Sequence, residues 1–279
     1  MKPTIKYDSK EKKNSSLCIF ASFHKGLYMD DFIHYFVDQL YGSNFDVVFV
    51  SNSVIADSDL AKLKKKCKRI IEKENLGLDF SAYKTGLLSE KYGTDYDHVL
   101  LTNVSIYGPL FPLEIILKKM EPFDFWGLTE NYEISYHLQS YFLCFNSKVT
   151  KSDVWRGFWD NVVSLEDKEE IILSYEVGLT RLLMESSLFN YSSYIRYFDF
   201  AKHIKSLEGY YNDEGSQEMR TYNSTLYHWD ILIEKYNFPF LKKTLVDRKE
   251  HWREAGIITS HWKKIIMENT RYPVQLIKE

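Results

Sequence analysis

Short apolar runs alternate with segments of helical periodicity through the first hundred residues, and this alternation is what most constrains the fold. Four runs have the length and composition of buried strands: residues 17–23, 46–52, 69–71 and 98–101. Between the first two, Phe32, Tyr35, Phe36 and Leu40 recur at helical spacing. A β-α-β-α-β-α-β order favours an α/β fold with a mainly parallel sheet and helices on both faces.

The later part of the chain is less regular. We expect helices at 112–120, from Asp153 onward, at 168–186 and in the regions 227–236 and 240–262, and strands at 124–129 and 137–145. Tyr-rich strand-like pieces follow Ser187, and a polar loop is expected at 212–217. The predicted organisation is an N-terminal tail (1–16), an α/β core (17–187) and a helical C-terminal extension packed on the core (188–279).

Charge, cysteines and hydropathy narrow the class of protein. The 279 residues carry a formal net charge of -3, which argues against a nucleic-acid-binding protein because phosphate contacts need a basic surface. Cys18, Cys67 and Cys144 are widely spaced, as in a protein with reduced thiols. No apolar stretch reaches the roughly 18 residues of a membrane span, and the lysine-rich N-terminus is not followed by a signal-type segment. We therefore expect a cytoplasmic protein, and contact with the inner face of the cell membrane is compatible with this.

The turn at 75–79 is the first candidate binding site. It contains Asn75, Gly77 and Asp79 between a short strand and a helix. Glycine lets the backbone approach a ligand closely, and a helix N-terminus favours anions such as a diphosphate. Asp79 could accept hydrogen bonds from a ribose or sugar hydroxyl. The structural alternative is a turn glycine followed by an aspartate cap.

The segment 103–109 is the second candidate site. It follows a buried strand, and ligands of open α/β sheets bind at the carboxyl ends of strands. Asn103, Ser105 and Tyr107 offer neutral hydrogen-bonding groups there, without a carboxylate. They are predicted to bind a donor substrate, with a capped turn as the alternative.

Polar residues near the next two predicted strand ends extend this edge. Trp126 and Thr129 lie at the end of the strand 124–129, and His137 and Gln139 begin the strand 137–145. Trp126, Thr129 and Gln139 are predicted to bind an acceptor. His137 is predicted as a catalytic residue that faces the acceptor or the transferred sugar, with a structural histidine as the alternative.

Glu176 is the predicted general base. It lies in a polar interruption of an otherwise apolar helix, where a carboxylate at a cleft could take a proton from an attacking hydroxyl. The alternative is a carboxylate on a solvated helix face.

Several motifs together resemble the rhamnan synthesis protein F family, bacterial glycosyltransferases of cell-surface polysaccharide assembly. The matching strings run in order from about residue 17 to 246: ENLGLDFSAY, LLTNVSIYGPLFPL, DFWGLT, HLQSYFLCFNSKV, the Phe158–Trp159 pair, YEVGLT and NSTLYHWDILIEKYNFPFLKKTLV. The resemblance implies a GT-A-like nucleotide-sugar fold. It also implies transfer of a sugar, often rhamnose, from a nucleotide-diphosphate donor to a growing glycan. We expect the transfer to be inverting, with Glu176 as the base, and the acceptor to be a lipid-linked or growing glycan.

Two positions depart from the pattern of this family. The turn after the fourth strand commonly reads Asn-Asp-Ser in the family, whereas here it reads Asn103-Val104-Ser105. A basic residue often stands where this chain has Leu78. The missing acid favours transfer without a metal; no metal ligand is assigned, and Mn²⁺ or Mg²⁺ stays an open alternative.

The Val104 departure also motivates a second hypothesis, a non-catalytic glycan-binding or scaffolding subunit of a polysaccharide assembly complex. A methyltransferase or another nucleotide-cofactor enzyme is less favoured, because the turn after the first strand has a single glycine, Gly26.

Overall fold

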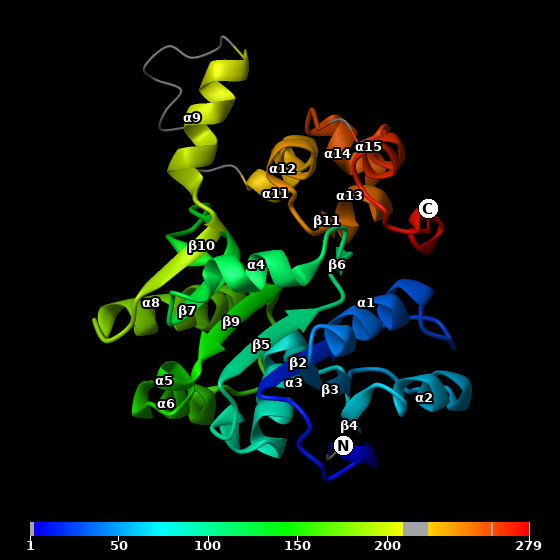
Figure 1. Ribbon diagram of the computed structural model, residues 1–279, viewed down its shortest axis with the longest axis vertical. Helices are drawn as coiled ribbons and strands as arrows, with labels where there is room; N and C mark the ends of the chain where they lie inside the picture. The colour runs from blue at the N-terminus through cyan, green and yellow to red at the C-terminus, as the bar shows by residue number, and fades with distance from the viewer. Residues whose placement is uncertain (1–2, 209–222, 258, 279) are drawn as a thin grey trace.

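The computed structural model describes residues 3–208, 223–257 and 259–278, and its centre is a mixed sheet with helices on both faces (Figure 1). Four parallel strands form one half of the sheet in the order β4-β3-β2-β5. Their bounds are β2 (Ser16–Ser22), β3 (Phe45–Ser51), β4 (Cys67–Glu72) and β5 (His98–Asn103). The connecting helices are α1 (Asp31–Gly42), α2 (Asp57–Leu63) and α3 (Leu78–Ser89). The predicted mainly parallel sheet flanked by helices is confirmed.

The other half of the sheet continues from β5 through one antiparallel strand. The order is β5-β9-β7-β10, where β9 (Phe142–Asn146) is antiparallel to both β5 and β7. The strands β7 (Phe125–Asn131) and β10 (Tyr191–Ile195) are parallel to each other. Because β9 reverses direction between them, β5 and β7 run the same way, and their carboxyl ends meet at one edge of the sheet.

The segments 137–145 and 4–8 differ from their predicted form. The single strand expected at 137–145 is two strands, β9 and the short β8 (His137–Leu138), which forms a hairpin with β7. The prediction was wrong because residues 139–141 leave the sheet to form buried polar contacts. The segment 4–8, expected within a tail, is an edge strand, β1 (Thr4–Asp8), antiparallel to β4.

Alternate residues of the strands supply two apolar cores, one on each face of the sheet. In β2, Cys18 and Phe20 belong to the core on the α1 side, while Leu17, Ile19 and Ala21 belong to the core on the α3 side. The second core also receives residues from further helices on that face: α5 (Ser147–Thr150), α6 (Asp153–Asn161) and α8 (Gly178–Glu185). Strands that are buried on both faces read as continuous apolar runs, which explains their clear signal in the sequence.

Strand pairing joins the C-terminal extension to the core. β10 completes the main sheet, and β11 (Leu241–Lys242) pairs with β6 (Ile106–Tyr107) in a separate two-stranded sheet. Figure 1 shows the C-terminal helices gathered on the far side of this small sheet from β5. They are α11 (Ser224–Tyr227), α12 (Trp229–Tyr236), α13 (Lys243–Asp247), α14 (Lys249–Glu254) and α15 (Trp262–Asn269). Trp229 and Trp262 are buried in the α1-side core, so they pack the extension against it.

Two elements connect or prolong these parts of the chain. Helix α4 (Leu113–Met120) follows β6, and α9 (Tyr197–Glu208) follows β10 and projects from the body of the molecule (Figure 1). The polar loop expected at 212–217 lies outside the described residues.

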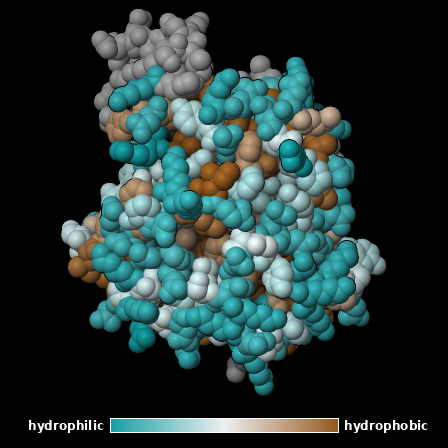
Figure 2. All heavy atoms as spheres, in the orientation of Figure 1, coloured by the Kyte–Doolittle hydropathy of each residue, from teal (hydrophilic) through white to brown (hydrophobic). Residues whose placement is uncertain are grey.

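Figure 2 shows a face that is mostly hydrophilic, with apolar side chains gathered in a recess near its middle. Cys18, Cys67 and Cys144 are buried free thiols. Within the described ranges, no helix combines the length and the apolar composition that crossing a membrane requires.

Candidate active site

A cavity of about 330 Å³ lies at the edge of the sheet where β5 and β7 end. Its walls come from the start of α3, the turn after β5, the β7–β8 hairpin, the helical segment around Glu176, and β11. The polar and charged lining residues are Asp79, Asn103, Ser105, Asn131, Glu133, His137, Gln139, Ser140, Tyr141, Lys168, Glu176, Asn223 and Lys242. Six residues predicted as site residues are therefore brought together here: Asp79, Asn103, Ser105, His137, Gln139 and Glu176.

The turn after β5 is tied to the first turn of α3. Asn103, the last residue of β5, donates from Nδ2 to Oδ2 of Asp79 at 2.8 Å. Its Oδ1 accepts from the backbone N–H and the hydroxyl of Ser105, at 3.0 and 2.6 Å. The carboxamide thus fixes both segments, and it positions the Asp79 carboxylate at the cavity wall.

The Asp79 carboxyl group titrates at an unusually high pH. Burial, together with the negative charge of Glu176, raises the pKa of Asp79 to about 6, while Lys242 and Lys168 oppose this shift. A carboxyl group of this kind carries its proton for part of the time near neutral pH. It can donate a hydrogen bond to a ligand when protonated and accept one when ionised.

Glu176 enters the cavity from a π-helical turn. The helix expected at 168–186 consists of α7 (Lys168–Ile171), the π-helical turn Ile172–Val177 and α8. The backbone N–H of Ser140 donates to Oε1 of Glu176 at 2.6 Å. Among the described residues, no hydrogen bond is made to Oε2, so this oxygen is available to a ligand. Such π-turns occur frequently at functional sites.

Lys242 supplies a cation to the same cavity from the C-terminal extension. Its Nζ lies 3.8 Å from the centroid of the Tyr141 ring, in a cation–π contact. Burial lowers the pKa of Lys242 to about 8, against the opposing charges of Glu176, Asp79 and Glu133. The cavity therefore holds acidic and basic groups together in a partly dehydrated space, which strengthens their interactions.

The β7–β8 hairpin provides the remaining polar wall. His137 is buried, and its Nδ1 donates to the Ser135 carbonyl at 2.9 Å, which leaves Nε2 as the acceptor nitrogen. Gln139 accepts from the Thr129 hydroxyl at 2.7 Å. Thr129 also accepts from the Tyr141 hydroxyl at 2.8 Å. These contacts tie the segment 139–141, which joins β8 to β9, to Thr129 of β7 at the wall of the cavity.

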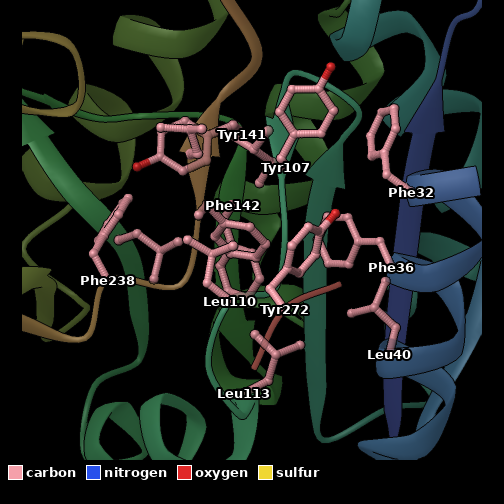
Figure 3. Close-up of a cluster of buried hydrophobic side chains, with 14 of the residues drawn as sticks. Phe32, Phe36, Leu40, Tyr107, Leu110, Leu113, Tyr141, Phe142, Phe238 and Tyr272 are labelled. Atoms are coloured by element: carbon pink, nitrogen blue, oxygen red, sulfur yellow. The ribbon is translucent and has the colours of Figure 1, made fainter. Parts of the chain in front are cut away.

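The other predicted site residues do not line the cavity. Asn75 is exposed, and Trp126 is 3% exposed, packed 5.8 Å from Phe142 between ring centroids. Thr129 is buried behind Gln139. Tyr107 packs at 4.8 Å from Phe32 in the α1-side core (Figure 3). Because these side chains do not line the cavity, its position does not support their predicted ligand contacts.

Gly77 is explained by the backbone. Its φ of +73° is left-handed, and a Cβ at this position would lie 2.9 Å from Cα of Ser164. Both features demand glycine, and neither involves the cavity.

Sequence reasoning missed five charged or amide residues of the lining: Asn131, Glu133, Lys168, Asn223 and Lys242. Asn131 and Glu133 follow the strand 124–129 closely, so the rule that ligands bind beyond strand ends could have found them. Lys242 sits in a string that resembles the family, but its position depends on the pairing of β11 with β6 across more than 130 residues.

The acidic, histidine and cysteine side chains do not form a metal-ligand cluster within the described residues. Over residues 3–208, 223–257 and 259–278, no three His, Cys, Asp or Glu side chains are clustered so that they could hold a metal ion. At the turn after β5, the position between Asn103 and Ser105 carries the partly buried apolar side chain of Val104.

Comparison with known proteins gives a family and several similar chains. The family model for rhamnan synthesis protein F matches residues 47–279. The uncharacterized protein y4gN of Sinorhizobium fredii is 26% identical over 272 residues, covering 82% of this chain and 71% of that protein. Virulence protein VirA of Vibrio anguillarum is 28% identical over 181 residues, covering 62% of this chain and 56% of VirA.

Solved structures of similar fold include two glycosyltransferases. The glycosyltransferase GlyE of Streptococcus pneumoniae is 15% identical with a TM-score of 0.42, covering 92% of this chain and 63% of GlyE. The galactosyltransferase LgtC, solved with donor and acceptor sugar analogs, is 11% identical with a TM-score of 0.38, covering 75% of this chain and 84% of LgtC.

Proposed function

The chain belongs to the rhamnan synthesis protein F family, and from this premise we propose that it is an inverting glycosyltransferase of cell-surface polysaccharide assembly. It transfers a sugar, with rhamnose the first candidate from the name of the family, from a nucleotide-diphosphate donor to a growing or lipid-linked glycan. The acceptor is met at the inner face of the cell membrane. One observation carries the proposal: Asp79, Asn103 and Glu176, from three different elements, line one cavity at the carboxyl edge of the sheet.

The donor is proposed to bind on the β5 side of this cavity. The carboxyl group of Asp79 takes hydroxyl groups of the donor, and Asn103 keeps that carboxyl group in place through its 2.8 Å hydrogen bond. The Ser105 hydroxyl adds a polar contact next to it. Hydrogen bonds of this kind orient a sugar, and each adds to the discrimination between sugars.

The acceptor is proposed to enter on the side of the β7–β8 hairpin. His137 offers Nε2 to an acceptor hydroxyl, and Gln139 lines the cavity beside it. Glu176 lines the same cavity as Asp79, and its Oε2 can accept the proton of the attacking hydroxyl while Ser140 holds Oε1. Fixing the base in this way removes part of the entropy cost of reaching the transition state.

The replacement Glu176→Gln tests this assignment. We expect sugar transfer to fall at least about 100-fold, because general-base catalysis contributes about 10²–10⁴-fold. Binding of the nucleotide sugar, measured by calorimetry, should change less than about threefold. Glu170→Gln is the matched control, because Glu170 is exposed on α7 one and a half turns before Glu176 and does not line the cavity.

Three results would count against the proposal. Full transfer by the Glu176→Gln variant overturns the role of Glu176 as the base. If the wild-type protein binds no member of a nucleotide-sugar panel, the enzyme assignment fails. Binding of glycans without any release of nucleoside diphosphate would instead support the scaffolding subunit.

A further inference from the structure

Lys242 places a positive charge in the cavity. The proposed proton transfer to Glu176 gives this lysine no role. Its position is set by backbone pairing, since Lys242 is opposite Ile106 in the β11–β6 ladder. The next residue, Lys243, donates its backbone N–H to the Ser105 carbonyl at 2.9 Å. The C-terminal extension thus holds the Lys242 amine next to the turn that follows β5, where Asn103 and Ser105 lie.

The ammonium group of Lys242 has unused donors. In the part of the chain that the structure describes, its Nζ makes no hydrogen bond and no salt bridge, and its close contact is the face of the Tyr141 ring. A lysine ammonium has three N–H donors, and leaving them without partners in a partly buried place costs free energy. An anionic ligand in the cavity would satisfy them.

We propose that Lys242, together with Lys168, forms the binding site for the diphosphate of the donor. This inference rests on the proposed function. Lys168 is exposed at the start of α7 and also lines the cavity. The two amines come from different parts of the chain, α7 and β11, and both line the cavity, so a diphosphate bound there has two cations to contact.

The acidic residues of the cavity explain why a cation is needed at this place. Asp79 on α3, Glu133 on the β7–β8 hairpin and Glu176 on the π-helical turn all act on Lys242 electrostatically. A diphosphate placed among these carboxylates without a cation would be repelled. An ammonium group between the carboxylates and the phosphates offsets the repulsion, as a divalent metal ion does in other phosphate sites.

During transfer the same contact acts on the leaving group. The acceptor oxygen forms a bond to the anomeric carbon, and the bond between that carbon and the phosphate oxygen breaks. The electron pair leaves with the nucleoside diphosphate, and the proton of the acceptor hydroxyl passes to Glu176. The N–H donors of Lys242 stabilise the charge that grows on the leaving phosphate oxygen, and Lys242 keeps its proton throughout.

Calorimetry on the full chain tests this inference with a panel of UDP, dTDP and GDP and the matching nucleosides. The variant is Lys242→Met, which keeps a long apolar side chain against Tyr141. We expect the affinity for the preferred diphosphate to fall roughly tenfold or more, as for the loss of a hydrogen bond to a charged group, and the nucleoside affinity to change less than about twofold. Lys242→Arg should recover part of the loss.

Lys243→Met is the matched control. Lys243 is the adjacent lysine, and its Nζ also lies over aromatic rings, 5.0 Å from the Phe32 centroid and 5.9 Å from the Tyr107 centroid, but it does not line the cavity. Its diphosphate affinity should match that of the wild type. Equal losses in the two variants would mean that any local change at β11 has this effect, and would overturn the inference.

The pH dependence gives a second readout. Because burial lowers the pKa of Lys242 to about 8, wild-type affinity for the diphosphate should fall between pH 7 and pH 9, and the Lys242→Met variant should not show this fall. A variant that binds the diphosphate within twofold of the wild type overturns the inference and leaves the proposed function standing. A loss that is fully restored by Mg²⁺ or Mn²⁺ also overturns it, because a metal would then hold the diphosphate. If the wild type binds no nucleotide at all, the proposed function fails with it.

Discussion

Two walls of the cavity are built in different ways. The β5 wall, made of Asp79, Asn103 and Ser105, comes from segments that directly follow parallel strands, and its side chains are bonded to one another. The C-terminal wall, made of Glu176 and Lys242, comes from a π-helical turn and from a strand added by the extension. Oε2 of Glu176 and the N–H donors of Lys242 make no hydrogen bond within the described chain.

This difference separates a preorganised wall from a reactive wall. Groups that already satisfy each other can orient a ligand with little loss of entropy, but they have few donors left to give. The charged groups of the C-terminal wall keep their bonding capacity for a ligand or a transition state. The comparison predicts that damage to the extension affects the site far more than equal damage elsewhere in the same core.

Leu241→Ala should produce the largest effect. Leu241 is fully buried in the α1-side core, directly before Lys242, so we expect a loss of about 2–5 kcal/mol in the free energy of unfolding. Because Leu241 anchors β11, the affinity for nucleoside diphosphates should fall as well. Urea unfolding and calorimetry measure the two effects.

Leu40→Ala is the control for this prediction. Leu40 is equally buried in the same core, but it lies on α1, which contributes no residue to the cavity lining. It should lose stability in the same range and keep its diphosphate affinity at a temperature where both variants are folded. A parallel loss of affinity in both variants would show that the extension has no special connection to the site.

The titration of Asp79, on the β5 wall, gives a prediction for the pH dependence of stability. Its pKa of about 6 in the folded protein is above the ordinary value of 3.8, so the folded state binds the proton more tightly than the unfolded state. The stabilisation that this proton provides is complete below about pH 3.8 and is lost as the pH rises through about 6. The change amounts to at most about 3 kcal/mol. The free energy of unfolding of the wild type should therefore decrease between pH 4.5 and pH 7. Asp79→Asn should lack this decrease, so its stability relative to the wild type should rise over the same range, measured by urea unfolding.

Asp8→Asn serves as the control in the same pH range. Burial opposes ionisation of Asp8, but hydrogen bonds from the Lys10 backbone and Arg69 outweigh it and lower the pKa of Asp8. Asp8 is therefore ionised in both states above about pH 5, and its replacement should leave the slope between pH 5 and pH 7 as in the wild type. A wild-type slope that persists in Asp79→Asn would mean that another group carries the titration.

The contrast between the walls also explains how far the sequence could predict the molecule. The strands β2 to β5 were predicted within about two residues, because they are buried on both faces and their apolar runs are bounded by turn residues. Asp79 and Asn103 followed from the rule for strand ends. Lys242 could not be placed in the cavity, since its neighbours are set by a pairing between distant segments.

The error at 137–145 has a related cause. Period and composition describe an apolar strand there, but Gln139 and Tyr141 both bond to Thr129 and leave the sheet. A hydrogen bond between side chains on separate strands leaves no periodic trace in the sequence. Tyr107 was predicted in the donor site because its polar hydroxyl lies near a strand end. In the structure its ring belongs to the apolar core.

Tyr107→Phe should have the smallest effect and separates these two interpretations of Tyr107. The hydroxyl is 3.5 Å from Oδ1 of Asp247, at the limit of a hydrogen bond, whereas the ring packs on Phe32. Removing the hydroxyl should therefore cost less than about 1 kcal/mol of unfolding free energy, and both transfer and donor affinity should stay within about twofold of the wild type. Tyr107→Ala, which removes the ring, should cost about 3–5 kcal/mol by comparison with other large aromatic residues. If Tyr107→Phe instead weakens donor binding tenfold with unchanged stability, the hydroxyl contacts the donor, and the β6–β11 sheet must open toward the cavity when the substrate binds.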